Sequence, residues 1–181
     1  LKAWRNTLLD YLGLLSEAPR NPHKITLISR RPYEHEGFKK SHIGRVIDNE
    51  KELEKVMKEK AGSTIFEVVD LAPLTFKDQL TKIRETSILV GMHGAGLVHA
   101  LFLPEDSMVV EIWPKAYGDN HRDRNLARHM GHVYMSYELD SPSDTVVHVN
   151  PQVFLDMMDH AIHVARGSFG TRVGRCGFLH C

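Results

Sequence analysis

Cysteine is scarce in this sequence, and long apolar runs are absent. Of the 181 residues, only Cys176 and Cys181 carry a thiol, and both lie within the last six residues. They could bridge to each other, pair with another segment or stay reduced, so they do not identify a redox compartment. His180 lies beside them, but two cysteines and one histidine are a weak set for zinc, and we expect no metal there. No apolar run approaches the roughly 20 residues that a membrane-spanning helix needs.

A net charge of either sign is also missing. Lysine plus arginine number 23, as do aspartate plus glutamate, so no overall field favours nucleic acid or an anionic membrane as a partner. Hydrophobic residues make up 42% of the chain and charged residues 25%, which is typical of a globular protein with its own core. Because no repeat and no low-complexity linker is visible, we expect one domain over residues 1–181. Since the first residue is leucine, we expect a fragment or a mature product.

The sequence does contain a glycine-rich turn between an apparent strand and a helix. Residues 88–90 are apolar, residues 91–96 hold three glycines, and from Leu97 onward apolar residues recur at helical spacing. Small side chains let a ligand approach the backbone, and N–H groups at a helix N-terminus attract anions. His93, within the turn, can donate a further hydrogen bond. The spacing matches neither the dinucleotide fingerprint nor a P-loop, so a turn that needs glycine only for steric reasons stays an alternative.

Apolar periodicity predicts strands and helices in alternation along the chain. The expected helices cover residues 3–15, 50–60, 76–84 and 151–164, with another starting near 97, and the expected strands cover 25–29, 64–69, 88–90, 108–113 and 132–137. This order implies an α/β fold with a doubly wound, mostly parallel, Rossmann-like sheet. Such sheets bind ligands at the carboxyl ends of their strands. We therefore expect Arg30, Arg31, the turn at 93–96 and the residues after Trp113 to meet at one edge.

Residues 88–104 and the strand after them resemble the signature of eukaryotic glycosyltransferase family 61. This family includes O-linked N-acetylglucosaminyltransferases and plant xylosyl- and arabinosyltransferases. The similar order is a strand, then Met-His-Gly-Ala-Gly-Leu, a helix ending in Leu-Phe-Leu-Pro, and a strand that carries Glu111. A strand that ends in two arginines, within residues 25–31, is a second similar feature, and the whole resemblance spans residues 24–137.

The resemblance implies the C-terminal, donor-binding half of a GT-B glycosyltransferase whose acceptor site lies in a missing N-terminal half. It implies transfer of N-acetylglucosamine, or of a pentose such as xylose, from a UDP-sugar to a protein or glycan acceptor with inversion. The implied compartment is the lumen of the secretory pathway, in the Golgi or the endoplasmic reticulum. No Asn-x-Ser/Thr glycosylation sequon supports that compartment independently. A donor-binding half of this kind could bind its donor without turning it over.

Transfer from a nucleotide sugar leaves negative charge on the diphosphate, which a cation must neutralise. No Asp-x-Asp pair is present to hold a metal, so we expect a site without metal or cofactor in which arginine meets the phosphates. Arg30 and His93 are the expected catalytic residues. The expected donor-binding residues are Arg30, Arg31, His93, Gly94, Ala95, Gly96, Glu111, Tyr117 and Asn120.

Glu111 lies within an apolar strand, where an unpaired carboxylate would be costly. It could accept hydrogen bonds from a ribose, orient His93, or pair internally with an arginine. Tyr117 and Asn120 follow in a polar loop, from which they could contact the base or the sugar. The chain has 12 histidines, but no acidic or cysteine partners follow at ligand spacing, so we expect packing or surface roles for residues such as His99.

Two other functions fit parts of the sequence. A noncatalytic nucleotide- or partner-binding α/β domain would share the same sheet edge but lack a catalytic base. A serine hydrolase could use His-Gly-Ala-Gly as an oxyanion loop, but it also needs a Gly-x-Ser-x-Gly elbow. That elbow is absent from the sequence, because residues 167–170 have the wrong spacing. The first alternative therefore stays open, and the second does not.

Overall fold

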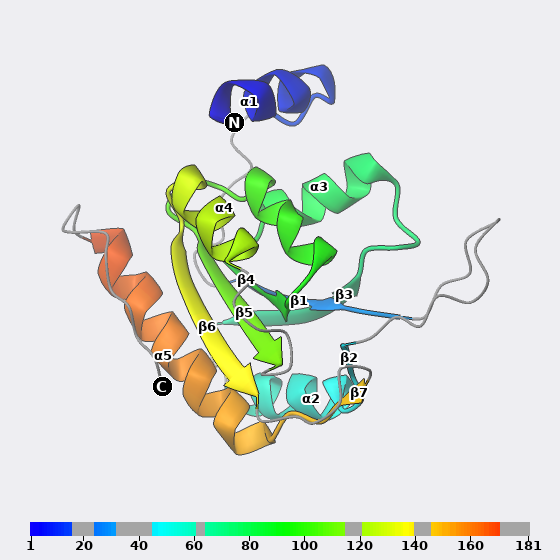
Figure 1. Ribbon diagram of the computed structural model, residues 1–181, viewed down its shortest axis with the longest axis vertical. Helices are drawn as coiled ribbons and strands as arrows, with labels where there is room; N and C mark the ends of the chain where they lie inside the picture. Colours follow the sequence, from blue (N-terminus) through cyan, green and yellow to red (C-terminus); the bar gives the residue numbers. More distant parts are fainter. Residues whose placement is uncertain (16–23, 32–44, 61–63, 115–120, 140–145, 171–181) are drawn as a thin grey trace.

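A five-stranded parallel sheet lies at the centre of the molecule, with helices on both faces (Figure 1). The computed structural model describes residues 1–15, 24–31, 45–60, 64–114, 121–139 and 146–170. The strand order is β3-β1-β4-β5-β6. These strands are β1 (Lys24–Ser29), β3 (Ile65–Asp70), β4 (Ile88–Met92), β5 (Met108–Pro114) and β6 (Val133–Leu139). A second, two-stranded parallel pair consists of β2 (Val46–Ile47) and β7 (Val146–Val147).

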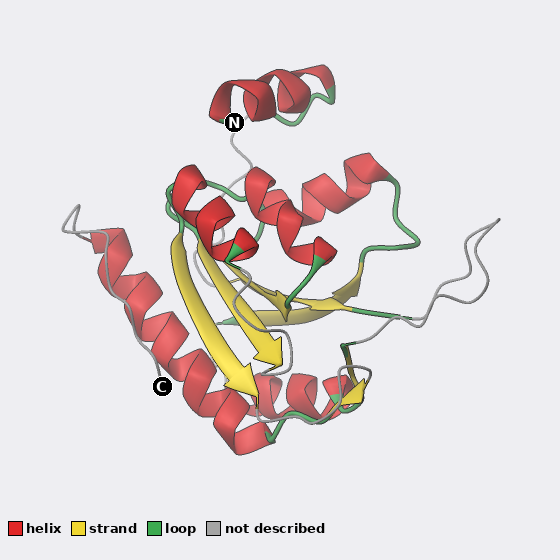
Figure 2. Ribbon diagram, in the orientation of Figure 1, coloured by secondary structure: helices red, strands yellow, loops and turns green. Residues whose placement is uncertain are grey.

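The helices divide between the two faces of the large sheet (Figure 2). One face is covered by α2 (Glu50–Lys60) and α5 (Pro151–Gly170), and the other by α3 (Phe76–Arg84), the 3₁₀ helix η1 (Ala95–Phe102) and α4 (Arg122–Met130). The first helix, α1 (Lys2–Tyr11), lies outside η1, where the ring centroids of Trp4 and Phe102 are 6.1 Å apart. Helices on both faces of a parallel sheet are the doubly wound arrangement that the sequence predicts.

Burial of the central strands on both faces explains their sequence. In β4, Ile88, Val90 and Met92 face the core beneath α2 and α5, whereas Leu89 faces the core beneath α3, η1 and α4. A strand that is buried on both sides has no polar face, so it appears in the sequence as an uninterrupted apolar run. The carboxyl ends of these strands, where polar residues begin, therefore lie together at one edge of the sheet.

Most of the predicted elements are present, and their ends differ by a few residues. The α/β fold class is confirmed, and Thr75 caps α3 as predicted, its hydroxyl accepting a hydrogen bond from the N–H of Asp78 at 3.2 Å. Three elements were not predicted from the sequence, namely β2, β7 and α4, and residues up to 124 were wrongly assigned to a loop although α4 begins at Arg122. The helix from Ala95 is 3₁₀ over its whole length.

Membrane insertion finds no support in the helices that the structure describes. None of them combines the length and the apolar composition needed to cross a bilayer. The GT-B architecture and the single domain over residues 1–181 stay predictions.

Candidate functional site

The carboxyl ends of β1, β4 and β5 bring the predicted residues together. These three strands are neighbours in the sheet, and Gly91 of β4 lies level with Ile28 of β1 and with Glu111 of β5. His93 follows β4 directly, and its backbone N–H donates to the carbonyl of Ile112 at 2.8 Å. Arg30 follows β1 on the neighbouring side. Residues that are far apart in the sequence therefore meet at one edge of the sheet.

Two arginine side chains flank the glycine turn after β4. Nη1 of Arg45 donates to the backbone carbonyl of His93 at 2.7 Å, and Nη1 of Arg30 donates to the same oxygen at 3.4 Å. Gly94 has φ +140°, a conformation that residues with a side chain rarely adopt, and a Cβ atom there would collide with Arg30 and press against Arg45. Glycine at this position thus lets two guanidinium groups approach the turn.

Arg45 was not predicted as a site residue. It lies immediately before the short strand β2 and has a φ of +68°. Only the fold brings it to the turn, and no periodicity or motif in its neighbourhood distinguishes it from a surface arginine. The structure thus adds a second cation to Arg30, which was predicted.

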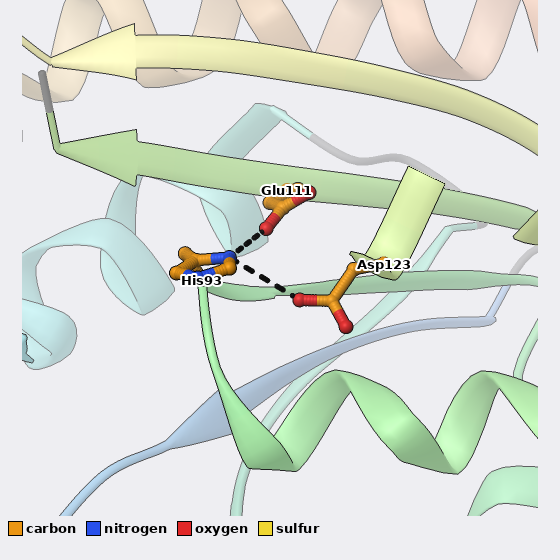
Figure 3. A group of neighbouring side chains, drawn as sticks. All are labelled: His93, Glu111 and Asp123. Carbon is orange, nitrogen blue, oxygen red and sulfur yellow. Dashed lines mark hydrogen bonds and ion pairs between the residues drawn. The ribbon is translucent and has the colours of Figure 1, made fainter. Parts of the chain in front are cut away.

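His93 is buried and is held through one ring nitrogen. Its side chain is 3% exposed, and Nδ1 lies 2.5 Å from Oε1 of Glu111 and 3.3 Å from Oδ2 of Asp123 (Figure 3). The ring also packs against Trp113, with ring centroids 4.3 Å apart. Burial lowers the pKa of His93, and the positive charges of Arg122, Arg45 and Arg30 lower it further, whereas Asp123 opposes the shift. The imidazole is therefore neutral at neutral pH.

Glu111 is fully buried, and its carboxyl group contacts the side chains of His93, Tyr134 and Asp123. Its Oε1 lies next to Nδ1 of His93, and its Oε2 accepts a hydrogen bond from the hydroxyl of Tyr134 at 2.5 Å. Burial raises the pKa of Glu111 to about 8, and the nearby Asp123 adds to the increase, while Tyr134 and Arg122 oppose it. Burial and contact with Glu111 also raise the pKa of Tyr134. Both shifts favour the uncharged forms of Glu111 and His93.

Asp123 is the third side chain of this cluster. It lies in the first turn of α4 and is 1% exposed. The guanidinium of Arg122 holds it through two hydrogen bonds, from Nε to Oδ1 at 2.8 Å and from Nη2 to Oδ2 at 2.9 Å. A bidentate pair of this kind fixes the position of the carboxylate. Neither residue was predicted, because their segment was wrongly assigned to a loop.

Imidazole and carboxylates also bind metal ions, so the cluster has to be compared with a metal centre. The ligand atoms of His93, Glu111 and Asp123 lie within 4.8 Å of one another. In the structure, however, Arg122 donates to both oxygens of Asp123, and Tyr134 and His93 each take one oxygen of Glu111. The same oxygens thus accept hydrogen bonds in this structure, and the absence of a metal here stays a prediction. We interpret the three side chains as a hydrogen-bonded network.

A pocket of about 190 Å³ opens beside the glycine turn. It lies at the carboxyl ends of β1, β3 and β4 and at the start of η1. The lining residues are Ile28, Ser29, Arg30, Arg31, Asp70, Leu71, Ala72, Gly91, Met92, Ala95, Gly96, Leu97 and His99. Four of the predicted donor-binding residues, Arg30, Arg31, Ala95 and Gly96, therefore line one hollow next to His93 and Gly94.

Arg31 has a structural partner as well as a place on the pocket wall. Its Nη2 donates to Oε2 of Glu50 at 2.6 Å, and Ser29 donates to the same oxygen at 2.9 Å. Glu50 is 4% exposed, and removing one partner of a buried carboxylate is destabilising. We therefore expect Arg31→Ala to lower the free energy of unfolding by about 1 to 2 kcal/mol.

Urea denaturation measures this effect, and Arg128→Ala is the matched control because Arg128 is exposed on α4. The control should leave the free energy of unfolding within about 0.5 kcal/mol of the unsubstituted chain. Equal stability of the two variants would contradict a structural role for Arg31.

The remaining predicted residues fall into two groups. Tyr117, Asn120, Cys176 and Cys181 lie outside the described residues, so their roles stay predictions. His99 packs as expected, with Nδ1 2.9 Å from the carbonyl of Gly96 and Nε2 3.0 Å from Oε1 of Gln79.

Known proteins resemble this chain over most of its length. The family Glycosyltransferase 61 matches residues 5–110. The EGF domain-specific O-linked N-acetylglucosamine transferase of Drosophila melanogaster is 32% identical over 141 residues, which is 76% of this chain and 24% of that protein. Protein O-linked-mannose beta-1,4-N-acetylglucosaminyltransferase 2 of Bos taurus is 38% identical over 84 residues, 44% of this chain and 14% of that protein.

The bovine EGF domain-specific O-linked N-acetylglucosamine transferase gives a similar match, 32% identity over 139 residues, which is 75% of this chain and 24% of that protein. The matched part of the chain thus spans about a quarter of the length of these relatives. The family match includes β1, β4 and the glycine turn. It ends within β5, at residue 110. Because this match covers more than half of the sequence, the chain belongs to glycosyltransferase family 61.

Proposed function

We propose that this chain binds the nucleotide-sugar donor of a glycosyltransferase. The observation that carries the proposal is the pair of guanidinium groups, of Arg30 and Arg45, at the glycine turn beside a pocket. Guanidinium groups keep their charge at all physiological pH values and make bidentate hydrogen bonds to phosphate oxygens. A diphosphate at this turn would meet two cations and the backbone of Gly94, which has no side chain of its own.

The donor in this proposal is a UDP-sugar. The relatives are named as N-acetylglucosamine transferases that act on EGF domains or on O-linked mannose, which favours N-acetylglucosamine as the transferred sugar and a protein or glycan as the acceptor. A pentose such as xylose is the other candidate. In the same proposal the chain forms the donor-binding half of a GT-B enzyme in the lumen of the secretory pathway, and an N-terminal half supplies the acceptor site.

The chemistry proposed for the site is stabilisation of the leaving group. When the bond between the sugar and the diphosphate breaks, negative charge grows on the diphosphate, and preorganised donors there lower the barrier. Arg30 and His93 would be the catalytic residues, and Arg45 would share the phosphate charge. Arg31, Ala95 and Gly96 would contact the donor from the pocket wall, Gly94 would give the phosphates access to the backbone, and Glu111 would hold His93. Transfer with inversion requires a base on the acceptor side, which the N-terminal half would supply.

Neutralisation of the diphosphate by arginine makes a metal unnecessary in this proposal. The test is a calorimetric titration of the 181-residue chain with UDP, uridine and ADP in the presence of a chelator. We expect saturable binding of UDP and weaker binding of ADP, which carries a different base. Binding of uridine should be much weaker, because the phosphates supply the charged contacts. Equal affinity for uridine and UDP would contradict the role of the arginines, and binding of UDP only after addition of a divalent cation would contradict metal independence.

A further inference from the structure

Residues 45–50, which include β2 and the first residue of α2, contact the candidate site at two points. At the start of this segment, Nη1 of Arg45 donates to the backbone carbonyl of His93 at 2.7 Å. At its end, Oε2 of Glu50 accepts a hydrogen bond from Nη2 of Arg31 at 2.6 Å. The path of this one segment therefore sets the positions of two guanidinium groups, one of its own and one of a residue that lines the pocket.

The segment is held in turn by residues 146–149, which lie 100 residues further along the chain. β2 and β7 pair in parallel and lie side by side next to the start of α2 (Figure 1). The N–H of Asp48 continues this ladder by donating to the carbonyl of Val147 at 3.1 Å. Each of the two strands has only 2 residues, and so short a pair is marginally stable by itself. Further contacts between the two segments therefore matter.

Asn49 supplies such a contact with its side chain. Its Nδ2 donates to the carbonyl of Val149 at 2.8 Å, and its Oδ1 accepts from the N–H of the same residue at 3.2 Å. The amide thus pairs with both polar groups of one backbone residue and lengthens the ladder by one step. Asparagine is common just before a helix, where its oxygen can cap the helix. Aspartate is as common there, but it lacks the donor that the carbonyl of Val149 requires.

Val149 is a firm point of attachment. It is fully buried in the core beneath α2 and α5. The next residue, Asn150, caps α5, because its Oδ1 accepts from the N–H groups of Gln152 at 2.9 Å and Val153 at 3.2 Å. The backbone that Asn49 binds is therefore held by the core of the sheet and by the start of α5.

We propose that Asn49 is a positioning residue of the donor site, although it does not line the pocket. By fastening residues 45–50 to Val149, it keeps the guanidinium of Arg45 on the carbonyl of His93. The backbone at Arg45 has a φ of +68°, a left-handed conformation that residues with a side chain seldom adopt, so the surrounding structure has to maintain it. The consequence for phosphate binding rests on the proposed function, whereas the placement of Arg45 does not.

The first arm of the test observes the carbonyl of His93 and needs no ligand. His93-Gly94 is the only His-Gly pair in the sequence, so labelling histidine carbonyls with carbon-13 and glycine with nitrogen-15 isolates this one peptide group by NMR. The carbonyl signal reports the hydrogen bonds that the oxygen accepts. We expect Arg45→Ala to shift it and Asn49→Ala to shift it in the same direction. An unchanged signal in a folded Asn49→Ala chain, or in Arg45→Ala, would overturn the proposal.

Asn150→Ala is the matched control for Asn49→Ala. Asn150 also lies directly before a helix, and its truncation removes two hydrogen bonds, so a loss of stability of about 1 kcal/mol is expected, as for other helix caps. The carbonyl signal of His93 should nevertheless stay in place. Equal shifts in the two alanine variants would indicate a general loosening of this region and would count against a specific role for Asn49.

Asn49→Asp is a second variant that decides the question even if Asn49→Ala does not fold. Aspartate keeps the size of asparagine, the capping oxygen and the acceptor for the N–H of Val149. It replaces the donor Nδ2 by an oxygen that faces the carbonyl of Val149 and the carboxylate of Glu52, to which Nδ2 also donates at 3.0 Å. We expect the signal of His93 to shift in the same direction as in Arg45→Ala, and an unchanged signal would contradict the proposal.

The second arm measures the binding of UDP and uridine. We expect Asn49→Ala to bind UDP about 3- to 10-fold more weakly and uridine within about twofold of the unsubstituted chain, since complete loss of one hydrogen bond to a charged group corresponds to roughly tenfold or more. In the Arg45→Ala background the same substitution should cause a clearly smaller loss, because the contact that it disturbs is already gone. Fully additive losses would show that Asn49 does not act through Arg45.

The two arms separate this inference from the proposed function. If no chain binds UDP but Asn49→Ala and Arg45→Ala shift the carbonyl signal alike, the donor proposal fails and the placement of Arg45 by Asn49 stands. If UDP binds and Asn49→Ala changes neither the signal nor the affinity, the role of Asn49 fails and the donor proposal stands. Circular dichroism of each variant shows that the comparison is made between folded chains.

Discussion

Replacing Arg30 and Arg45 together by alanine is expected to weaken UDP binding by a factor of about 100 or more and to leave uridine binding unchanged. Each guanidinium at the glycine turn would make a charge-assisted hydrogen bond to a phosphate, worth about 1.5 to 3 kcal/mol. Every 1.4 kcal/mol corresponds to a factor of about ten in affinity. Uridine has no phosphate, so its affinity reports on the pocket alone. Calorimetric titration of both ligands measures the two affinities side by side.

The single variants and a lysine pair sharpen this comparison. Both arginines donate to the same carbonyl, that of His93, at 3.4 and 2.7 Å, so each single alanine variant should lose part of the affinity and leave the other guanidinium in place. The double Arg→Lys variant should recover some affinity but not all, because an ammonium keeps the charge without the bidentate geometry. Arg128→Ala, on the exposed side of α4, should have no effect. Parallel losses for UDP and uridine would show that the substitutions disturb the pocket rather than the phosphate contacts.

The two arginines also shape the turn at Gly94, so a stability measurement accompanies the binding measurement. A Cβ atom at this position would collide with Arg30 and press against Arg45, so the turn and the guanidinium groups fit each other. Removing the arginines relaxes that constraint, and the turn could then move. Thermal unfolding of the double variant, compared with that of Arg128→Ala, shows whether the turn still contributes to the fold. A chain of normal stability that has lost only UDP binding is the result that the phosphate role requires.

The sheet was predictable from the sequence because its central strands are buried on both faces. Apolar runs such as Ile88–Val90 have no other common explanation when glycine and a helix follow. In contrast, α4 contains only Leu126, Ala127 and Met130 as apolar residues among nine, so its periodicity is weak. It was not predicted, and its first residues, up to Arg124, were assigned to a loop. Its clearest signal is Gly131, which ends the helix in the left-handed conformation at φ 84°.

The candidate site was only half predictable, for a related reason. The rule that ligands bind at the carboxyl ends of parallel strands led to Arg30 and His93. Glu111 was predicted with three alternative roles, of which the contact with His93 is the one that the geometry contains, while contact with a ribose stays a prediction. The other residues of the site are placed only by the fold. The register between β5 and β6 places Tyr134, the weakly patterned helix α4 places Asp123, and the path of the chain before β2 places Arg45. A tyrosine in a strand or an arginine before a short strand looks the same in a sequence whether it packs, pairs or binds.

Between pH 6 and pH 8 the chain is expected to lose stability, and Glu111→Gln is expected to lose much less. Burial raises the pKa of Glu111 from 4.5 to about 8. In this window the folded chain holds the proton and the unfolded chain has released it, so rising pH favours unfolding. The stabilising contribution is complete below the unfolded pKa and disappears as the pH rises through the folded one. Each pH unit within the window corresponds to about 1.4 kcal/mol, so the expected change is on the order of 2 to 3 kcal/mol.

Urea denaturation of both proteins at several pH values isolates Glu111, because every other titrating group is common to the two. His93 acts in the opposite direction and at lower pH: burial lowers its pKa, so its contribution to stability is lost as the pH falls below about 6.5. Because His93 is common to both proteins, the difference between them should change with pH from about 4.5 to about 8, with the glutamine variant gaining relative stability across that range. Parallel profiles would mean that Glu111 is ionised in the folded chain.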